Sequence, residues 1–161
     1  MVVGWDHGVF VPMLLVNPKA DVPIVQMSVL DSEDAAEHFK MGQALQALRE
    51  SNVAIIASGA ASFHNIRSMF SGVSKEPAFR ARNVAWNLAV MDGIKDAEPE
   101  SRRKKFESWR DWPNAYEMHP KRGAEHFLPL IVAAGAGGHG EGESYTDEFL
   151  GLETFSYYWQ Q

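Results

Sequence analysis

Histidine is the residue type in this chain best suited to metal or proton chemistry. An imidazole can bind zinc or iron, and it exchanges a proton near neutral pH. The chain has no cysteine, so any metal site must be built from imidazoles and carboxylates. Its six histidines are His7, His38, His64, His119, His126 and His139.

Three of these histidines lie in settings typical of a reactive site. His7 follows Asp6 in a Trp-Asp-His-Gly sequence, so the carboxylate can either orient the ring or cap a helix. His64 follows a short apolar run and a Ser-Gly loop, which places it beyond the carboxyl end of an expected strand, where ligands bind in open α/β sheets. His126 follows Glu125, so an imidazole and a carboxylate stand at adjacent positions.

The remaining candidates have ordinary structural interpretations. His38 falls in an acidic helix start and is expected to be solvated. His119 is expected in a turn because a proline follows it, and His139 is expected to be exposed in a glycine-rich loop over 135–142. That loop follows a helix and lacks the Lys-Ser/Thr pair of a phosphate-binding loop. The basic run Arg102–Lys105 is expected to form a solvated helix face.

Helices and strands are expected to alternate along the chain and to position these residues. The apolar runs Ile24–Leu30 and Val53–Ala57 predict buried strands, and Thr154–Trp159 predicts a final strand. Helical spacing and helix-start signals predict helices over His7–Leu15, Ala35–Arg49, Ala78–Val90, Ala97–Arg110 and Glu125–Ala134. This order predicts an α/β fold in which helices flank a central mixed sheet, with one domain over residues 1–161.

Composition excludes several classes of protein. The chain has 15 Lys+Arg against 21 Asp+Glu, a net charge of −6, which argues against nucleic acid as a partner. It contains no run of 18 apolar residues, so no membrane span is expected. The first sixteen residues lack a basic start and are interrupted by polar residues, so no signal peptide is expected. We therefore expect a soluble cytoplasmic protein.

Four blocks, in order along the chain, form a recognisable pattern. They are Trp5–Pro12, Ala20–Ser28, Ser58-Gly59 with Phe63–Asn65, and His119-Pro120 with Glu125–Leu130. Together they resemble the class III extradiol ring-cleavage dioxygenases, the LigB-like superfamily, and most closely its DOPA 4,5-dioxygenase branch. The resemblance covers nearly the whole chain and concerns the carboxyl-terminal part of these enzymes. It implies a version of the LigB-like fold that is incomplete.

This resemblance implies a non-haem iron(II) enzyme that opens a catechol ring with O₂, with zinc possible in the same site. The position matching His64 lies at the metal and also serves in acid/base catalysis. The position matching His7 lies over the substrate as a second acid/base group. Glu125 and His126 match the pair that supplies a metal ligand from this part of the family's chain.

Three further residues would support this centre. Asp6 would orient the neighbouring imidazole or cap its helix, and Ser58 and Asn65 would shape the backbone around the metal. The chemistry suits these residue types, because a catechol must lose protons to bind iron and a histidine can accept them.

The pattern departs from the family at its front. The family's chains carry a preceding region that contributes two further histidine ligands, and this sequence begins almost directly before Trp5. The ligand set is therefore expected to be incomplete, or to be completed by a homo-oligomer or a partner chain. The alternatives are a truncated, catalytically silent fold that acts as a binding or interaction subunit, and a fragmentary gene product. A metal-dependent hydrolase would use the same histidines but has no motif of its own.

An incomplete sheet also has a consequence for association. If the family's first strands are absent, Ile24–Leu30 or Val53–Ala57 would expose an unpaired edge. The sequence therefore predicts dimerisation or poor solubility.

Overall fold

A computed structural model describes residues 4–160 of the chain. Within this range the fold is α/β, with seven α-helices, two 3₁₀ turns and one antiparallel pair of strands. The elements are α1 (His7–Val16), α2 (Ala35–Arg49), α3 (Ile66–Ser71), η1 (Val73–Lys75), α4 (Pro77–Ile94), α5 (Pro99–Glu107), η2 (Trp109–Asp111), α6 (Ala115–Met118), α7 (Leu128–Ala136), β1 (Glu143–Phe149) and β2 (Leu152–Tyr158). None of these helices is both long enough and apolar enough to cross a membrane.

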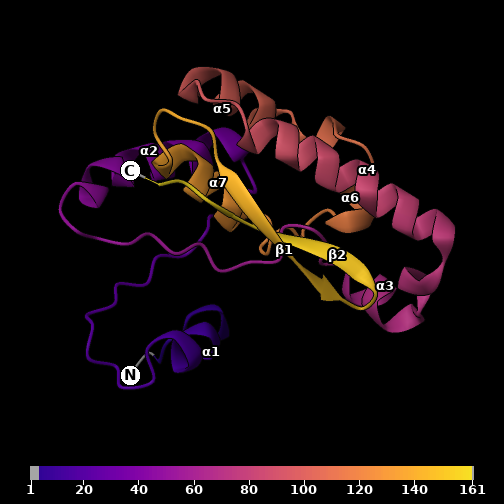
Figure 1. The fold of residues 1–161 in the computed structure, drawn as a ribbon, viewed down its shortest axis with the longest axis horizontal. Helices are drawn as coiled ribbons and strands as arrows, with labels where there is room; N and C mark the ends of the chain where they lie inside the picture. The colour runs from indigo at the N-terminus through magenta and orange to yellow at the C-terminus, as the bar shows by residue number, and fades with distance from the viewer. Residues whose placement is uncertain (1–3, 161) are drawn as a thin grey trace.

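An aromatic core joins α4 and α5 to the segment that precedes α7. Helix α4 runs along one side of the main body, with α5 at its C-terminal end (Figure 1). Phe127, just before α7, packs against Trp109 at 4.6 Å and against Trp86 of α4 at 5.1 Å between ring centroids. All three side chains are buried. Burial of several large rings is among the strongest apolar contributions a core can make, so it fixes the chain immediately after His126.

Helices α2 and α7 cross with their backbones in contact. A Cβ atom on Gly42 of α2 would overlap the carbonyl oxygen of Val132, and one on Gly135 of α7 would overlap the carbonyl oxygen of Phe39. Only glycine permits this approach. At the end of α2, the Arg49 guanidinium donates hydrogen bonds to the carbonyls of Ala136 and Gly137, which holds the end of α7.

The C-terminal strands form a tight hairpin. Strand β1 pairs with β2 from Glu143–Tyr158 to Phe149–Leu152. The two connecting residues, Leu150 and Gly151, both have positive φ angles (54° and 76°), as the mirror-image turns that match the twist of a hairpin require. The strand expected near the C-terminus is thereby confirmed as β2.

The other two expected strands do not form in the described part of the chain. Ile24–Leu30 and Val53–Ala57 are extended, but the only ladder among residues 4–160 joins β1 to β2. The α/β class is confirmed, while the central mixed sheet is replaced by a two-stranded one. The physical reason is that a strand needs a neighbouring backbone, and these runs have none beside them. Several of their apolar side chains therefore face solvent: Val25 is 94% exposed and Ile56 is 62% exposed, whereas Val29 is partly buried against the core.

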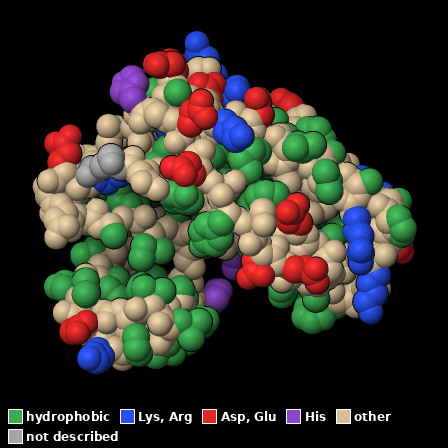
Figure 2. Space-filling model, in the orientation of Figure 1, with side chains coloured by type: hydrophobic (Ala, Val, Ile, Leu, Met, Phe, Trp, Pro, Cys, Tyr) green, Lys and Arg blue, Asp and Glu red, His purple; other side chains and the backbone are tan. Residues whose placement is uncertain are grey.

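Helix α1 lies apart from the other helices (Figure 1). It forms where expected, because the Asp6 side chain accepts a hydrogen bond from the amide of Gly8 at its start. None of its residues is buried, although the helix is strongly apolar. We call α1 and the extended segment that follows it, residues 7–30, the N-terminal lobe. Hydrophobic side chains cover much of the surface of this lobe (Figure 2).

This exposed apolar surface predicts self-association. The most exposed large apolar side chains of the lobe are Leu15, in α1, and Val25, in the extended segment after it. Contiguous apolar patches normally mark contact sites. We expect the purified protein to elute from a size-exclusion column as a dimer or larger species. The double substitution Val25→Lys/Leu15→Lys should shift it towards the monomer, and a monodisperse wild-type monomer would contradict the prediction.

The basic run on α5 is only partly a solvated face, and the expectation is wrong for Arg102. Its side chain is fully buried, and the guanidinium donates hydrogen bonds to the carbonyls of Ala134, Gly138 and Gly140. These bonds satisfy a buried charge and hold the glycine-rich loop against α5. The expected exposure of His139, which lies in that loop, is confirmed.

Candidate metal centre

The loop that carries His64 is held from several sides. The carbonyl of Ala61 accepts hydrogen bonds from Trp86 Nε1 and from His119 Nε2, each at 2.9 Å. The carbonyl of Ser62 accepts one from Asn83 Nδ2 at 2.9 Å. The amide of His64 itself donates to the carbonyl of Met118 at 3.0 Å. These bonds to α4 and to the end of α6 fix the backbone from which the His64 ring projects.

The loops of His64 and His126 meet directly. The amide of Ala60 donates to the carbonyl of His126 at 2.8 Å. Gly59 lies so close that a Cβ atom there would overlap the same carbonyl oxygen. As a result the two imidazole rings face each other, with centroids 3.6 Å apart and planes inclined by 31°.

Three side chains at this contact could hold a metal ion. Donor atoms of His64, Glu125 and His126 all lie within 4.8 Å of one another. Glu125 is exposed, and its Oε1 lies 4.0 Å from His126 Nε2. Burial, and then the proximity of His126, hold the pKa of His64 below its usual value. A neutral imidazole is the form that binds a metal, so the donor set fits a divalent cation of the zinc or iron kind.

His7 joins this group from the start of α1. Its ring lies 6.1 Å from that of His126 between centroids. Its Nδ1 lies 3.0 Å from Asp6 Oδ1, while the other oxygen of Asp6 caps α1. The two roles considered for Asp6, helix cap and partner of the imidazole, are therefore filled at once. Figure 2 shows histidine side chains in the notch between the N-terminal lobe and the main body.

The two remaining predicted site residues lie next to these loops. Asn65 caps α3, accepting from the amide of Ser68 at 3.3 Å, and its Nδ2 donates to the carbonyl of Glu117 at 2.8 Å. Ser58 is exposed, and its Oγ faces the start of α1 near Gly8. The structure thus brings together all seven predicted site residues, whose chemical roles stay predictions.

Two other histidines are buried, which corrects the expectation for His38. His38 is not solvated: its Nε2 accepts from the amide of Leu30, and its Nδ1 donates to the carbonyl of Asp34 at 2.6 Å. His119 lies in the bend after α6, and Trp86, Trp109 and Phe127 enclose its ring. In both cases long-range packing, which the local sequence does not reveal, decides the environment.

Acid should destabilise the protein through His119. Burial lowers the pKa of His119 to about 3, whereas an unfolded histidine titrates near 6.5. Between these values the unfolded chain binds the extra proton, so this contribution to stability is fully present above pH 6.5 and is lost as the pH falls towards 3. We expect the free energy of unfolding to fall by about 2 kcal/mol from this group between pH 7 and pH 5. Urea unfolding at both pH values measures it.

The control for this pH dependence is His119→Gln, whose side chain does not titrate. Its free energy of unfolding should fall less than that of the wild type over the same pH range. An equal fall in the two proteins would show that another group is responsible.

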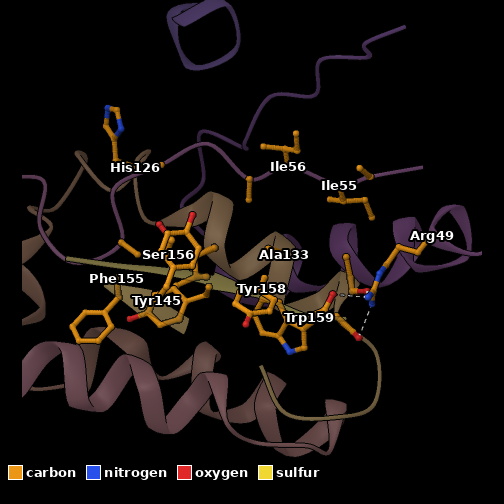
Figure 3. A pocket seen from close by; sticks show the side chains of 18 of the residues that line it. Arg49, Ile55, Ile56, His126, Ala133, Tyr145, Phe155, Ser156, Tyr158 and Trp159 are labelled. Atoms are coloured by element: carbon orange, nitrogen blue, oxygen red, sulfur yellow. Dashed lines mark hydrogen bonds between the residues drawn. The ribbon is translucent and has the colours of Figure 1, made fainter. Parts of the chain in front are cut away.

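A groove of about 560 Å³ opens beside His126. It lies between the extended Val53–Ala57 segment and the aromatic face of the hairpin, which includes Tyr145 and Tyr158. Figure 3 shows the ring of His126 at one end, pointing away from the tyrosines. The volume is within the range of small-molecule sites, and the lining is mostly apolar and aromatic.

Comparison with known proteins shows the family of this chain. The family described as "Catalytic LigB subunit of aromatic ring-opening dioxygenase" matches residues 2–157. The chain belongs to the LigB family. A dioxygenase of Hapsidospora irregularis, tasH, is 52% identical over 97% of the chain and 49% of its own length. A 4,5-DOPA dioxygenase extradiol of Beta vulgaris is 34% identical over 84% of the chain and 47% of its own length.

A solved structure carries the same fold. The uncharacterized protein JW3007 of Escherichia coli K12 superposes with a TM-score of 0.75 at 29% identity. The match covers 96% of this LigB-family chain and 62% of the JW3007 chain. By the coverage of the two dioxygenases above, the chain spans about half the length of the curated relatives that it matches.

Two residues that shape the centre have no obvious sign in the sequence. Gly59 stands in the sequence as part of a Ser-Gly pair, and the one available signal is a glycine a few residues before a candidate ligand, which is typical of a close backbone approach. For His119 the one available signal is its place in the His-Pro pair of a motif block, while its contacts with Ala61 and Phe127 arise only from tertiary packing.

Proposed function

We propose that this chain carries part of the catalytic centre of a non-haem iron(II) extradiol dioxygenase that opens a catechol ring, such as that of DOPA, with O₂. The observation that carries the proposal is the convergence of His64, Glu125 and His126 within 4.8 Å, with the His7 ring beside them. Membership of the LigB family and the names of the relatives give it independent support.

The donor set favours iron. Two imidazoles and one carboxylate are the ligands typical of non-haem iron(II) oxygenases, and zinc would bind the same groups. His64, Glu125 and His126 would hold the ion from one side. When bound, the ion supplies open positions for the catechol oxygens and for O₂. Additional ligands would come from the region that the longer relatives have or from another chain.

His7 is proposed as the base that prepares the catechol. The Nδ1 of His7 donates a hydrogen bond to Asp6 Oδ1, which leaves the Nε2 lone pair free. Nε2 then takes a proton from a catechol hydroxyl, and the Asp6 carboxylate stabilises the resulting imidazolium. His64 has a depressed pKa, so its ring stays neutral near pH 7 and can act as a ligand or as a proton acceptor.

A second candidate is a binding or interaction subunit without activity of its own. Two observations favour it: the chain spans about half the length of its relatives, and none of the residues of α1 is buried. In this case the histidines would contribute to a centre completed by a partner.

One experiment separates the two candidates. The purified protein is loaded with Fe(II) without air, titrated with DOPA or another catechol, and then exposed to O₂. Consumption of O₂ with a yellow ring-cleaved product supports the dioxygenase and excludes the silent subunit. Bound iron and catechol without any product would contradict the proposed activity for this chain and favour the second candidate. The variant His7→Ala should bind iron but form product more slowly, by a factor of roughly 10² or more.

A further inference from the structure

The carbonyl of Ala61 is held by two aromatic donors at once. It belongs to the loop that leads to His64, three residues further along the chain. Trp86 Nε1 and His119 Nε2 each donate to it at 2.9 Å. Both donor rings are fully buried, and Ala61 itself is partly buried. Two hydrogen bonds therefore restrain the backbone of the loop at Ala61.

His119 also supports the second imidazole of the centre. Its ring packs on Phe127 at 5.0 Å between centroids, and Phe127 directly follows His126. One side chain thus touches the loop of His64 by a hydrogen bond and the segment of His126 by ring packing. Between these two contacts the His64 and His126 rings face each other at 3.6 Å.

The hydrogen-bond pattern of His119 is unusual for a residue with only a packing role. A carbonyl can only accept, so Nε2 carries the hydrogen and Nδ1 presents a bare lone pair. Nδ1 is buried and has no partner among the described residues. A phenylalanine would fill the same aromatic space without this unsatisfied atom. What a histidine adds at this position is the single bond to Ala61.

We propose that His119 is a positioning residue for the candidate metal centre. Its Nε2–H fixes the Ala61 carbonyl, and its ring face fixes Phe127. Together these contacts keep the His64 and His126 imidazoles facing each other. The inference rests on the proposed function only in taking that pair of rings to be metal ligands. The positioning itself is a property of the metal-free chain.

The test compares two substitutions at this position with a distant control. His119→Phe keeps an aromatic ring and removes the donor, whereas His119→Gln keeps an N–H that can reach Ala61. The control Ile94→Val removes one buried methyl group at the C-terminal end of α4, away from the bonds of Asn83 and Trp86. Two quantities are measured: the nuclear Overhauser effect between the His64 and His126 rings in the metal-free protein, and the affinity and visible spectrum of bound Co²⁺.

We expect His119→Phe to lose the Overhauser effect and to bind Co²⁺ about 10- to 100-fold more weakly, with an altered spectrum. Ile94→Val should resemble the wild type in both measurements, and His119→Gln, which keeps the donor but loses the ring packing on Phe127, should lose less than His119→Phe in both. An unchanged Overhauser effect and unchanged Co²⁺ affinity in His119→Phe would overturn the inference. So would equal losses in His119→Phe and Ile94→Val, because that would indicate general loosening of the core.

Two further outcomes are covered by the same design. If the wild type binds no Co²⁺, the proposed metal centre fails, and the Overhauser comparison alone judges His119. If His119→Phe does not fold, His119→Asn replaces it, since the shorter amide cannot reach Ala61. His119→Asn should then lose more of the Overhauser effect between the His64 and His126 rings than His119→Gln does, and equal behaviour of the two amides would contradict the positioning role.

Discussion

Replacing His126 with alanine is expected to weaken the binding of Fe(II) or Zn²⁺ on the order of 100-fold or more, because losing a ligand should exceed the 10- to 100-fold cost typical of its supporting residues. The His126 ring lies in the middle of the centre, 3.6 Å from that of His64 and 6.1 Å from that of His7. Its donor atom is also within 4.8 Å of that of Glu125. His38 and His119 cannot take its place, since both are buried and hydrogen-bonded elsewhere.

The measurement is a titration with each metal against a competing chelator. His64→Ala should behave in the same way as His126→Ala. His139→Ala is the matched control, because His139 is an exposed histidine outside the cluster, near Glu98, and its loss should leave the affinity unchanged. Stoichiometric metal binding that survives both His64→Ala and His126→Ala would disprove the ligand assignment.

Gly59→Ala is expected to disturb the same centre without removing any ligand. The added Cβ would overlap the carbonyl oxygen of His126, which also accepts the hydrogen bond from the amide of Ala60. Backbone on both sides cannot yield as a flexible side chain would, so the two histidine loops must move apart. We expect the free energy of unfolding to fall by about 1–3 kcal/mol, the usual cost of overpacking. Metal affinity should fall by roughly 10- to 100-fold as the imidazoles separate.

Gly123→Ala is the matched control for this steric effect. It makes the same change in another loop, but its Cβ would meet only ordinary contacts, the nearest at 3.6 Å from the carbonyl oxygen of Pro120. Chemical denaturation and chelator competition on both variants provide the comparison. If Gly59→Ala matched Gly123→Ala in stability and metal affinity, the close approach of the two loops would not matter for the centre.

Local signals in the sequence determined the helices well. The prediction for Ala35–Arg49 coincides with α2, because Asp34 caps it by accepting from the amide of Glu37 and because helical bonds join residues only four apart. The start of α1 at His7 follows in the same way from Asp6. The ordered motif blocks, which require no tertiary information, identified the family and the candidate residues His64 and His126.

Strand formation was not predictable from the same kind of pattern. Ile24–Leu30 and Val53–Ala57 have the composition of buried strands, but a ladder depends on a second segment whose position no local pattern gives. Only the hairpin of β1 and β2 supplies its own partner through a two-residue turn. The two apolar runs therefore stay extended, and most of their residues are exposed in this chain.

The sequence by itself determined which residues could do chemistry: imidazoles and carboxylates, because cysteine is absent, in motifs of the LigB family. Only the tertiary structure decided how they are held. It buried His119 between Ala61 and Phe127, and it brought the carbonyl of His126 against Gly59. The physical reason is range: helix caps and motifs act over a few neighbouring residues, whereas the centre is built by contacts between segments about sixty residues apart along the chain.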